Sequence, residues 1–396
     1  MATFDPLNVE PVINACGPVT RLGGAPMPPE VIEAIGRAAG DAASLAQLQA
    51  AASRVIARHT GAEAGLVTSG SAAALTLGAA AILAGLDPAR MERLPDTSGF
   101  PAEFVVAREQ RSGYDHAVRA AGGKLVEAGF NEIVAGAGVR RTEAWELEAA
   151  ISDRTAGILY VVTPDSRPPL EEVVELARRH LLPVLVDAAG QLPPRENLRR
   201  FIDAGADLVC FSGGKAIRGP QASGILCGRA ALVASAAVQM LDMDDHPELW
   251  SPPLEWRELA QLRSIPRHGI GRAMKVAKEE IVGLVTALNL FAAGKYDEEL
   301  PLMRSRLELI AERLAGLPVE CQIVDTHAEV PPLLRVTLGA AAPRTAMEVC
   351  RLLREGSPPI HVGHGELHDG RLVLHPLCLR EGHAELIAQR LATVLQ

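Results

Sequence analysis

The sequence is poor in features that would each identify a class of protein. Aromatic residues make up 3% of its 396 residues, too few to build the stacking platforms that bind single-stranded nucleic acid. The formal net charge is -9, which opposes binding to a phosphate backbone. The longest apolar stretch, Ala72 to Leu86, contains Thr76 and is shorter than a membrane-spanning helix. We therefore expect neither a nucleic acid nor a membrane as a partner.

Paired cysteines and a recognisable leader are also missing. The six cysteines (16, 210, 227, 321, 350 and 378) are scattered, form no CxxC pair and mostly lie among apolar residues. That usage is typical of a reducing compartment. The first ten residues hold two acids, no base and no apolar segment, which is unlike a signal peptide. These features indicate a cytoplasmic protein.

What the chain does contain is a regular alternation of apolar runs and helical patterns. Its length and its 48% hydrophobic content allow two domains. Continuous apolar strands separated by helices indicate an α/β fold with a mostly parallel sheet covered on both faces. Strands are predicted at 104–107, 124–126, 157–162, 183–187 and 208–211, and helices at 114–121, 143–151, 170–180 and 196–204.

The pattern changes after Pro266. A long helix is predicted from Gly271 to about Ala293, followed by strands at 333–338, 360–362 and 372–374, the last two flanking a hairpin turn at Asp369-Gly370. This second pattern is α+β. We therefore predict an N-terminal segment (1–40) that packs with the small domain, a large α/β domain (41–265), and a linking helix with a small C-terminal α+β domain (266–396).

Three segments carry residues that suit one cofactor. Ser69-Gly70-Ser71 lies in a small-residue turn at 65–73 that opens a helix, where free N–H groups and hydroxyls bind anions. Asp187 ends an apolar strand, where it could hold a protonated ring nitrogen or a metal, or cap the next helix. Lys215 lies beside two glycines after a buried strand, a place that suits imine chemistry, with a surface turn as the alternative. Together they supply what pyridoxal phosphate requires.

Several motifs resemble one family. The chain resembles the fold-type-I pyridoxal-phosphate enzymes, and within them the group containing L-seryl-tRNA(Sec) selenium transferase and D-glucosaminate-6-phosphate ammonia-lyase. The motifs that carry the resemblance span most of the chain and are Ile13–Gly17, Val186–Gln191, Ser212–Lys215, Gly219–Gly224 and Gly269–Lys275. The resemblance implies a large domain with a mostly parallel sheet, a smaller α+β C-terminal domain and a homodimer or higher homo-oligomer.

The resemblance also implies roles for individual residues. Lys215 would bind pyridoxal phosphate through its amine and move the Cα proton, and Asp187 would keep the ring nitrogen protonated. Ser69, Gly70, Ser71 and Ser212 would bind the phosphate. Either Tyr114 or His116 would cover the ring face, or both are exposed first-turn residues. Arg272 would help complete the neighbouring subunit's site, or it is a helix-surface charge paired with Glu279 or Glu280.

Substrate-binding residues are less clearly marked. Arg335 falls near where many relatives place the arginine for the substrate carboxylate, and Arg141 matches an Arg-Thr pair of the selenium transferases. Either could instead be a surface charge. His361 is a further candidate for substrate binding. With His364 and His368 it resembles a metal cluster, but in a strand and turn the three are expected on different faces without an acid or cysteine, so we expect no metal.

The reaction that we favour is α,β-elimination. A hydroxylated amino acid or amino-sugar acid would lose its β-hydroxyl and then ammonia, which leaves a 2-keto acid. Selenium transfer to a tRNA is disfavoured because the chain is acidic, poor in aromatics and has few residues before Ile13. An aminotransferase or other transferase, or a racemase, is the alternative within enzymes. A non-catalytic regulatory protein that binds pyridoxal phosphate is the alternative outside them.

Overall fold

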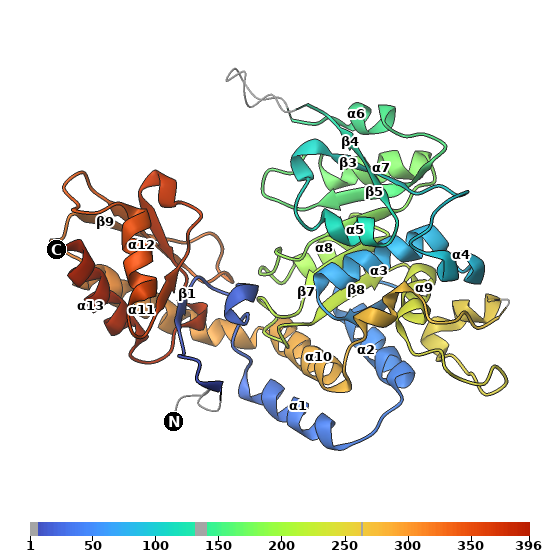
Figure 1. Ribbon diagram of the computed structural model, residues 1–396, viewed down its shortest axis with the longest axis horizontal. Coiled ribbons are helices and arrows are strands. Elements are labelled where there is room, and N and C mark those ends of the chain that lie inside the picture. Colours follow the sequence, from blue (N-terminus) through green and yellow to red (C-terminus); the bar gives the residue numbers. More distant parts are fainter. Residues whose placement is uncertain (1–6, 131–140, 263) are drawn as a thin grey trace. The chain divides into compact units, whose positions relative to one another are not determined.

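The computed structural model describes residues 7–130, 141–262 and 264–396 (Figure 1). Contacts divide the chain into two compact units. The large unit is Met27–Ala292, and the small unit combines the chain up to Pro26 with Ala293–Gln396. These bounds differ from those expected at 40 and 265. The difference arises because helix α1 (Pro29–Gly40) packs against helix α10 (Lys278–Ala292), so both belong to the large unit.

The large unit is built on one seven-stranded sheet. Strand β8 (Gly224–Gly228) is antiparallel to both of its neighbours, and all other pairs in the sheet are parallel. The apolar strands of its centre are buried, as two covered faces require. This arrangement confirms the predicted α/β class. In spatial order the strands are β2 (Ala64–Thr68), β8 (Gly224–Gly228), β7 (Leu208–Ser212), β6 (Val184–Asp187), β5 (Thr155–Val161), β3 (Glu103–Ala107) and β4 (Lys124–Ala128).

Helices cover this sheet closely. On α3 (Ser71–Ala84) a Cβ added at Gly78 would lie 2.9 Å from Leu185 Cδ1 of β6, so glycine lets this helix approach the strands. In the described parts of the chain, none of the helices is both long and apolar enough to cross a membrane. Besides α1 and α10, the helices of the large unit are α2 (Leu45–Thr60), α3 (Ser71–Ala84), α4 (Pro88–Arg93), α5 (Asp115–Ala120), α6 (Ala144–Ala149), α7 (Leu170–Arg179), α8 (Asn197–Asp203) and α9 (Ala230–Met240).

The elements predicted between 104 and 211 are confirmed, each within two residues of its expected bounds. The small-residue turn predicted at 65–73 is wrong in its first part, because Ala64–Thr68 is the buried strand β2. Gly65 is the reason why a turn was predicted where the strand lies. A Cβ there would lie 2.4 Å from Ile56 Cγ2, so this glycine serves the packing of α2 on β2 rather than a turn.

The long helix predicted from Gly271 is also wrong at its start. A 3-10 helix, η6 (Ile270–Met274), comes first, and α10 begins only at Lys278. Close packing keeps η6 separate, since a Cβ at Gly271 would lie 2.4 Å from Leu77 Cδ2. Glu280 then marks the start of α10 by accepting a hydrogen bond from the Ala277 amide at 3.1 Å.

The small unit holds two small sheets. Strand β1 (Ile13–Ala15) pairs in parallel with β11 (Ile360–Val362), and an antiparallel sheet has the order β12-β10-β9. Its core combines residues from both ends of the chain, including Ile13, Leu334 and Leu391. The other elements are β9 (Val319–Val324), β10 (Leu333–Leu338), β12 (Arg371–Leu374), α11 (Leu300–Arg313), α12 (Ala346–Glu355) and α13 (His383–Leu395).

The hairpin expected across Asp369-Gly370 is not formed as a strand pair. The two strands themselves are present, but β11 pairs with β1 and β12 pairs with β10. A single bridge between Gly363 and Val373 joins the two segments. The turn does contain a left-handed residue, Gly370, with φ 73°. The turn at Gly370 was therefore predicted correctly. The pairing of β11 was not, because its partner strand comes from the other end of the sequence.

Candidate active site

The register of the large sheet brings three chain segments to one edge. Thr68, the last residue of β2, lies opposite Gly224 of β8, and Gly224 lies opposite Ser212, the last residue of β7. Asp187 ends β6 beside β7. The segments that follow Thr68, Asp187 and Ser212 therefore leave the sheet at the same edge, where open α/β sheets bind their ligands.

The first segment forms a turn that opens α3. Gly70 has φ 94°, and its amide and carbonyl are held by Thr68 through hydrogen bonds of 2.9 Å each. A Cβ on Gly224 would lie 2.4 Å from the Gly70 carbonyl carbon, so only glycine lets β8 approach this turn. A Cβ on Gly70 would meet no atom within 4 Å. The start of α3, whose first amides have no acceptor within the helix, therefore opens onto free space.

The two serines of this segment have different surroundings. Ser69 donates its hydroxyl proton to the Met274 carbonyl at 2.9 Å, which ties the turn to η6. Ser71 is the first residue of α3 and is half-buried. Ser212 is likewise half-buried at the end of β7. Of the predicted phosphate-binding groups, Ser71 and Ser212 keep their hydroxyl donors available among the described residues, whereas the Ser69 hydroxyl and the Gly70 amide already have acceptors.

The second segment is a closed loop after β7 that holds Lys215. The Gly213 amide donates to Ser223 O and the Gly219 amide donates to Gly213 O, each at 2.9 Å. A Cβ on Gly213 would lie 2.2 Å from Ser223 Oγ, and one on Gly214 would lie 2.5 Å from Gln221 Cα. Both glycines are thus required for the loop to close. Lys215 lies directly after them and is half-buried.

Asp187 lies at the end of β6, and Lys215 reaches the turn that follows it. A Cβ on Gly190 would lie 3.7 Å from Lys215 Nζ, which places the amine beside the Asp187–Gly190 turn. Asp187 is 8% exposed, and one carboxylate oxygen accepts from the Ala189 amide at 3.0 Å. Burial raises the pKa of Asp187, while this hydrogen bond and the Lys215 charge oppose the rise. The Lys215 amine and the Asp187 carboxylate therefore lie in the same part of the sheet edge, as binding to one cofactor would require.

Two side chains that the sequence analysis did not single out fix this turn. Gln191 donates through Nε2 to the Val162 carbonyl of the neighbouring segment at 2.7 Å. Asn197, at the start of α8, donates to the Gln191 carbonyl at 2.7 Å, and its own side-chain oxygen is buried without a partner. Gln191 follows Asp187 within one of the motifs, and that proximity is the only signal by which sequence reasoning could have found it.

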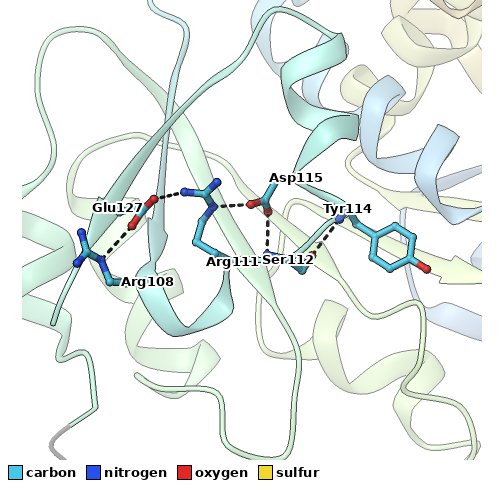
Figure 2. Close-up of polar contacts among 6 residues, drawn as sticks. All are labelled: Arg108, Arg111, Ser112, Tyr114, Asp115 and Glu127. Atoms are coloured by element: carbon cyan, nitrogen blue, oxygen red, sulfur yellow. Dashed lines mark hydrogen bonds and ion pairs between the residues drawn. The ribbon is translucent and has the colours of Figure 1, made fainter. Parts of the chain in front are cut away.

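Tyr114 and His116 follow β3 and are both exposed. Figure 2 shows that Arg111 lies between Asp115 and Glu127, that Glu127 also pairs with Arg108, and that the Tyr114 ring points away from this network. Buried Asp115 further accepts from the Ser112 amide at 3.3 Å. The network orients the loop before α5, and which of the two rings covers the cofactor stays a prediction.

Arg272 has a different partner from either one considered. It forms an ion pair with Asp242 at 2.9 Å from within η6. The two glutamates considered as partners bind other groups, since Glu279 forms an ion pair with Lys278 and Glu280 accepts a hydrogen bond from the Ala277 amide. Arg272 therefore does not open the long helix, and the alternative reading, in which it pairs with Glu279 or Glu280, is wrong. Its role in a neighbouring subunit stays a prediction.

Arg141 is exposed and lines a cavity of about 560 Å³ together with Trp145 and Arg167. The neighbouring Thr142 is fixed by Glu109, which accepts from its amide at 2.8 Å. Gly136-Ala137-Gly138, an incomplete dinucleotide-binding pattern in the sequence, lies outside the described residues. The cavity beside Arg141 is open to a ligand, and its use by substrate stays a prediction.

Arg335 and His361 belong to the small unit. Arg335 on β10 forms an ion pair with Glu366 at 3.3 Å, which matches the surface-charge alternative. His361 on β11 lies 3.4 Å from a guanidinium nitrogen of Arg21, and the same guanidinium lies 3.4 Å from His364. The expectation that these histidines lie on different faces is therefore wrong for His361 and His364. A cation between them favours an anion as ligand rather than a metal.

The chain is similar to known enzymes along its whole length, although no family model matches it. D-glucosaminate-6-phosphate ammonia lyase of Salmonella typhimurium is 30% identical over 99% of this chain and 98% of its own. The 5'-C-glycyluridine monooxygenase-decarboxylase of a Streptomyces species is 31% identical over 99% of this chain and 92% of its own. L-seryl-tRNA(Sec) selenium transferase of Geotalea daltonii is 26% identical over 95% and 81%.

Solved structures show the same relationship. The structure of D-glucosaminate-6-phosphate ammonia-lyase superposes with a TM-score of 0.81 at 30% identity and covers 100% of this chain and 98% of its own. An aspartate aminotransferase of Thermus thermophilus has a TM-score of 0.50 at 18% identity over 99% of this chain and 94% of its own, which shows a shared fold.

Proposed function

Because this chain belongs to the group of fold-type-I pyridoxal-phosphate enzymes that contains D-glucosaminate-6-phosphate ammonia lyase and the selenium transferases, we propose that it is a pyridoxal-phosphate-dependent ammonia lyase. Its substrate is a hydroxylated amino acid or amino-sugar acid. The observation that carries this proposal is that buried Asp187 and the Lys215 amine lie at one sheet edge, next to a helix start that opens onto free space.

These residues fit pyridoxal phosphate. The open start of α3 at Gly70 suits a phosphate, with Ser71 and Ser212 as hydroxyl donors. Buried Asp187 suits a protonated ring nitrogen, because a cation there offsets the cost of burying the carboxylate. Lys215 at the Gly190 turn suits the aldehyde carbon. When bound, the cofactor supplies an electron sink for the electrons of a broken Cα–H bond.

The chain's own residues then perform the remaining tasks. Lys215 takes the Cα proton of the substrate through its amine. Asp187 would remain ionised beside a bound ring nitrogen and would hold a proton on it. The β-hydroxyl leaves as water, and the released enamine takes up water to give a 2-keto acid and ammonia. Tyr114 or His116 excludes water from one face, and Arg141, Arg335 and His361 are the candidates for the acid and hydroxyl groups of the substrate.

We also propose a homodimer that acts in the cytoplasm on a small molecule and not on a tRNA. The net charge of -9 supports the exclusion of a tRNA. None of the six cysteines, all of which lie in the described residues, forms a disulfide, which supports a reducing compartment.

The cofactor assignment is tested by colour. The purified protein, reconstituted with pyridoxal phosphate, should absorb in the near-visible, and Lys215→Ala should lose that band while Lys275→Ala keeps it. Absorbance spectra after dialysis measure both. A wild-type protein that stays colourless with added pyridoxal phosphate would refute the assignment.

The reaction is tested by a substrate screen. D-glucosaminate 6-phosphate and hydroxylated D- and L-amino acids should be supplied to the coloured protein, with ammonia and keto acid measured in equal amounts. The 31% identity to a monooxygenase-decarboxylase makes oxidative decarboxylation the second candidate. Oxygen uptake and carbon dioxide release distinguish that reaction, because elimination needs no oxygen and keeps the carboxylate.

A further inference from the structure

The small unit contains a group of basic side chains that the proposed reaction does not use as a set. Arg21, Arg354, His361 and His364 form this arginine–histidine cluster. The Arg21 guanidinium lies 3.4 Å from Nδ1 of His361, 3.4 Å from Nδ1 of His364 and 3.3 Å from the Cys16 thiol. Arg354 is close enough to lower the pKa of His361 beyond the effect of burial. All of these residues belong to one compact unit.

The hydrogen bonds define what the histidines offer. A guanidinium only donates, so the two Nδ1 atoms that face Arg21 accept. A histidine that accepts at Nδ1 carries its proton at Nε2. The exposed His364 therefore offers an N–H donor in addition to the guanidinium donors of the cluster.

The cluster borders a cavity of about 810 Å³ between α12 and the segment after β11. Arg21, Arg354, His364 and His368 line it on the basic side. Its two carboxylates have partners, since Glu355 pairs with Arg351 at 3.0 Å and Glu348 accepts from the Thr345 amide at 2.8 Å. In the described parts of the chain no carboxylate pairs with Arg21 or Arg354. Two guanidiniums that have no carboxylate partner among the described residues therefore face one cavity, in a protein whose net charge is -9.

We propose that this cavity binds the phosphoryl group of a small phosphorylated molecule. Two guanidiniums and an imidazole N–H supply more donors than the two oxygens of a carboxylate accept, whereas a phosphomonoester dianion presents three free oxygens. The volume leaves room for the organic part of the ligand. The cavity shares no residue with the cofactor's phosphate cradle, which is formed by residues of the large unit. It does not rest on the proposed reaction.

Inorganic phosphate is the probe, and the protein is saturated with pyridoxal phosphate so that the cradle is occupied. Calorimetric titration should show binding to wild type, and Arg21→Gln and Arg354→Gln should each weaken it about tenfold or more. Arg313→Gln, an exposed arginine of the same unit outside the cavity, removes the same charge and should change the dissociation constant less than twofold. Acetate should bind at least tenfold more weakly than phosphate.

Three results would overturn the proposal. One is phosphate binding that Arg21→Gln and Arg354→Gln leave unchanged. Another is equal weakening by Arg313→Gln, which would indicate a general charge effect. The third is acetate binding as tight as that of phosphate, which would indicate a carboxylate site. Far-ultraviolet circular dichroism and thermal unfolding without phosphate show that the variants are folded. Because binding is measured without turnover, a failure here leaves the proposed function untouched, and the reverse also holds.

Discussion

Single residues show where function opposes stability. Burial raises the pKa of Asp187 from its usual value, and the charge of the nearby, half-buried Lys215 opposes this rise only in part. A folded protein with a raised carboxyl pKa retains a proton that the unfolded chain has already lost. The stability that such a carboxyl group contributes is therefore fully present below its pKa in the unfolded chain, and it is lost as pH rises through its pKa in the folded protein. At neutral pH the ionised Asp187 destabilises the cofactor-free protein.

Asp187→Asn should consequently stabilise the cofactor-free protein at pH 7 while it slows turnover about 100-fold, because an amide cannot hold the ring nitrogen protonated. The Asn side-chain oxygen still accepts from the Ala189 amide, so the turn is kept. Urea unfolding without pyridoxal phosphate and steady-state rates with it measure the two effects. A variant that is less stable and fully active would show that Asp187 is only a helix or turn cap.

His375 predicts an acid-sensitive small unit. It packs against Gly17, where an added Cβ would lie 2.8 Å from its ring, and its Nδ1 accepts from the Leu377 amide at 3.2 Å. Burial lowers the pKa of His375 from 6.5 to about 4. Between these values the unfolded chain binds a proton that the folded protein does not, so stability falls as pH falls from 6.5 to about 4.

His375→Gln should reduce this loss by up to about 1.4 kcal/mol per pH unit within that window. Urea unfolding of the small unit at several pH values measures the slope. His327→Gln, at an exposed loop residue, serves as the control and should leave the slope unchanged. Parallel slopes for wild type and His375→Gln would mean that other groups cause the acid sensitivity.

At the scale of elements, the loop between β3 and α5 depends on one buried carboxylate. Asp115 is 4% exposed and joins Arg111 and the Ser112 amide, and Arg111 continues to Glu127 of β4 (Figure 2). Asp115→Asn should lower the free energy of unfolding of the large unit by about 1 to 3 kcal/mol, because Arg111 loses a charged acceptor. Chemical denaturation measures this change.

Glu33→Gln is the matched control for that change. Glu33 pairs with Arg37 at 3.7 Å with both side chains exposed, so its loss should barely alter stability. Equal effects of Asp115→Asn and Glu33→Gln would show that the Asp115 network does not hold the loop.

Elements also show what the sequence could and could not predict. Strands such as β5 and β6 were predicted because burial on both faces leaves a continuous apolar run. Strand β2 was misread because its Gly65 serves packing against Ile56, which lies in another element. Asp187 and Lys215 were found because each lies at a strand end beside small residues. The Asp242 partner of Arg272 is 30 residues away, beyond what local spacing reveals.

For the whole molecule, assembly gives a further prediction. If Arg272 completes the site of a neighbouring subunit, mixing the inactive variants Lys215→Ala and Arg272→Ala should restore about one quarter of the wild-type activity. Half of the randomly re-formed dimers would be hybrids, and each would contain one intact site. Activity after dissociation and re-association measures this recovery.

Subunit exchange should be verified by mass spectrometry of the mixed sample. Asp242→Asn, which removes the observed partner of Arg272 within the chain, is the control. If hybrids form without recovery of activity, Arg272 acts within its own chain.

The composite small unit has a consequence for biosynthesis. Strand β1 (Ile13–Ala15) leaves the ribosome before any part of the large unit, but its partner β11 (Ile360–Val362) is translated only after the large unit is finished. Ile13 and Ala15, which are 2% and 0% exposed in the folded protein, must therefore stay unpaired while the intervening chain is made. In the sequence, the large unit is an insertion between the two parts of the small unit. The small unit therefore completes its fold last, and a nascent chain that stalls before residue 360 cannot form the β1–β11 pair.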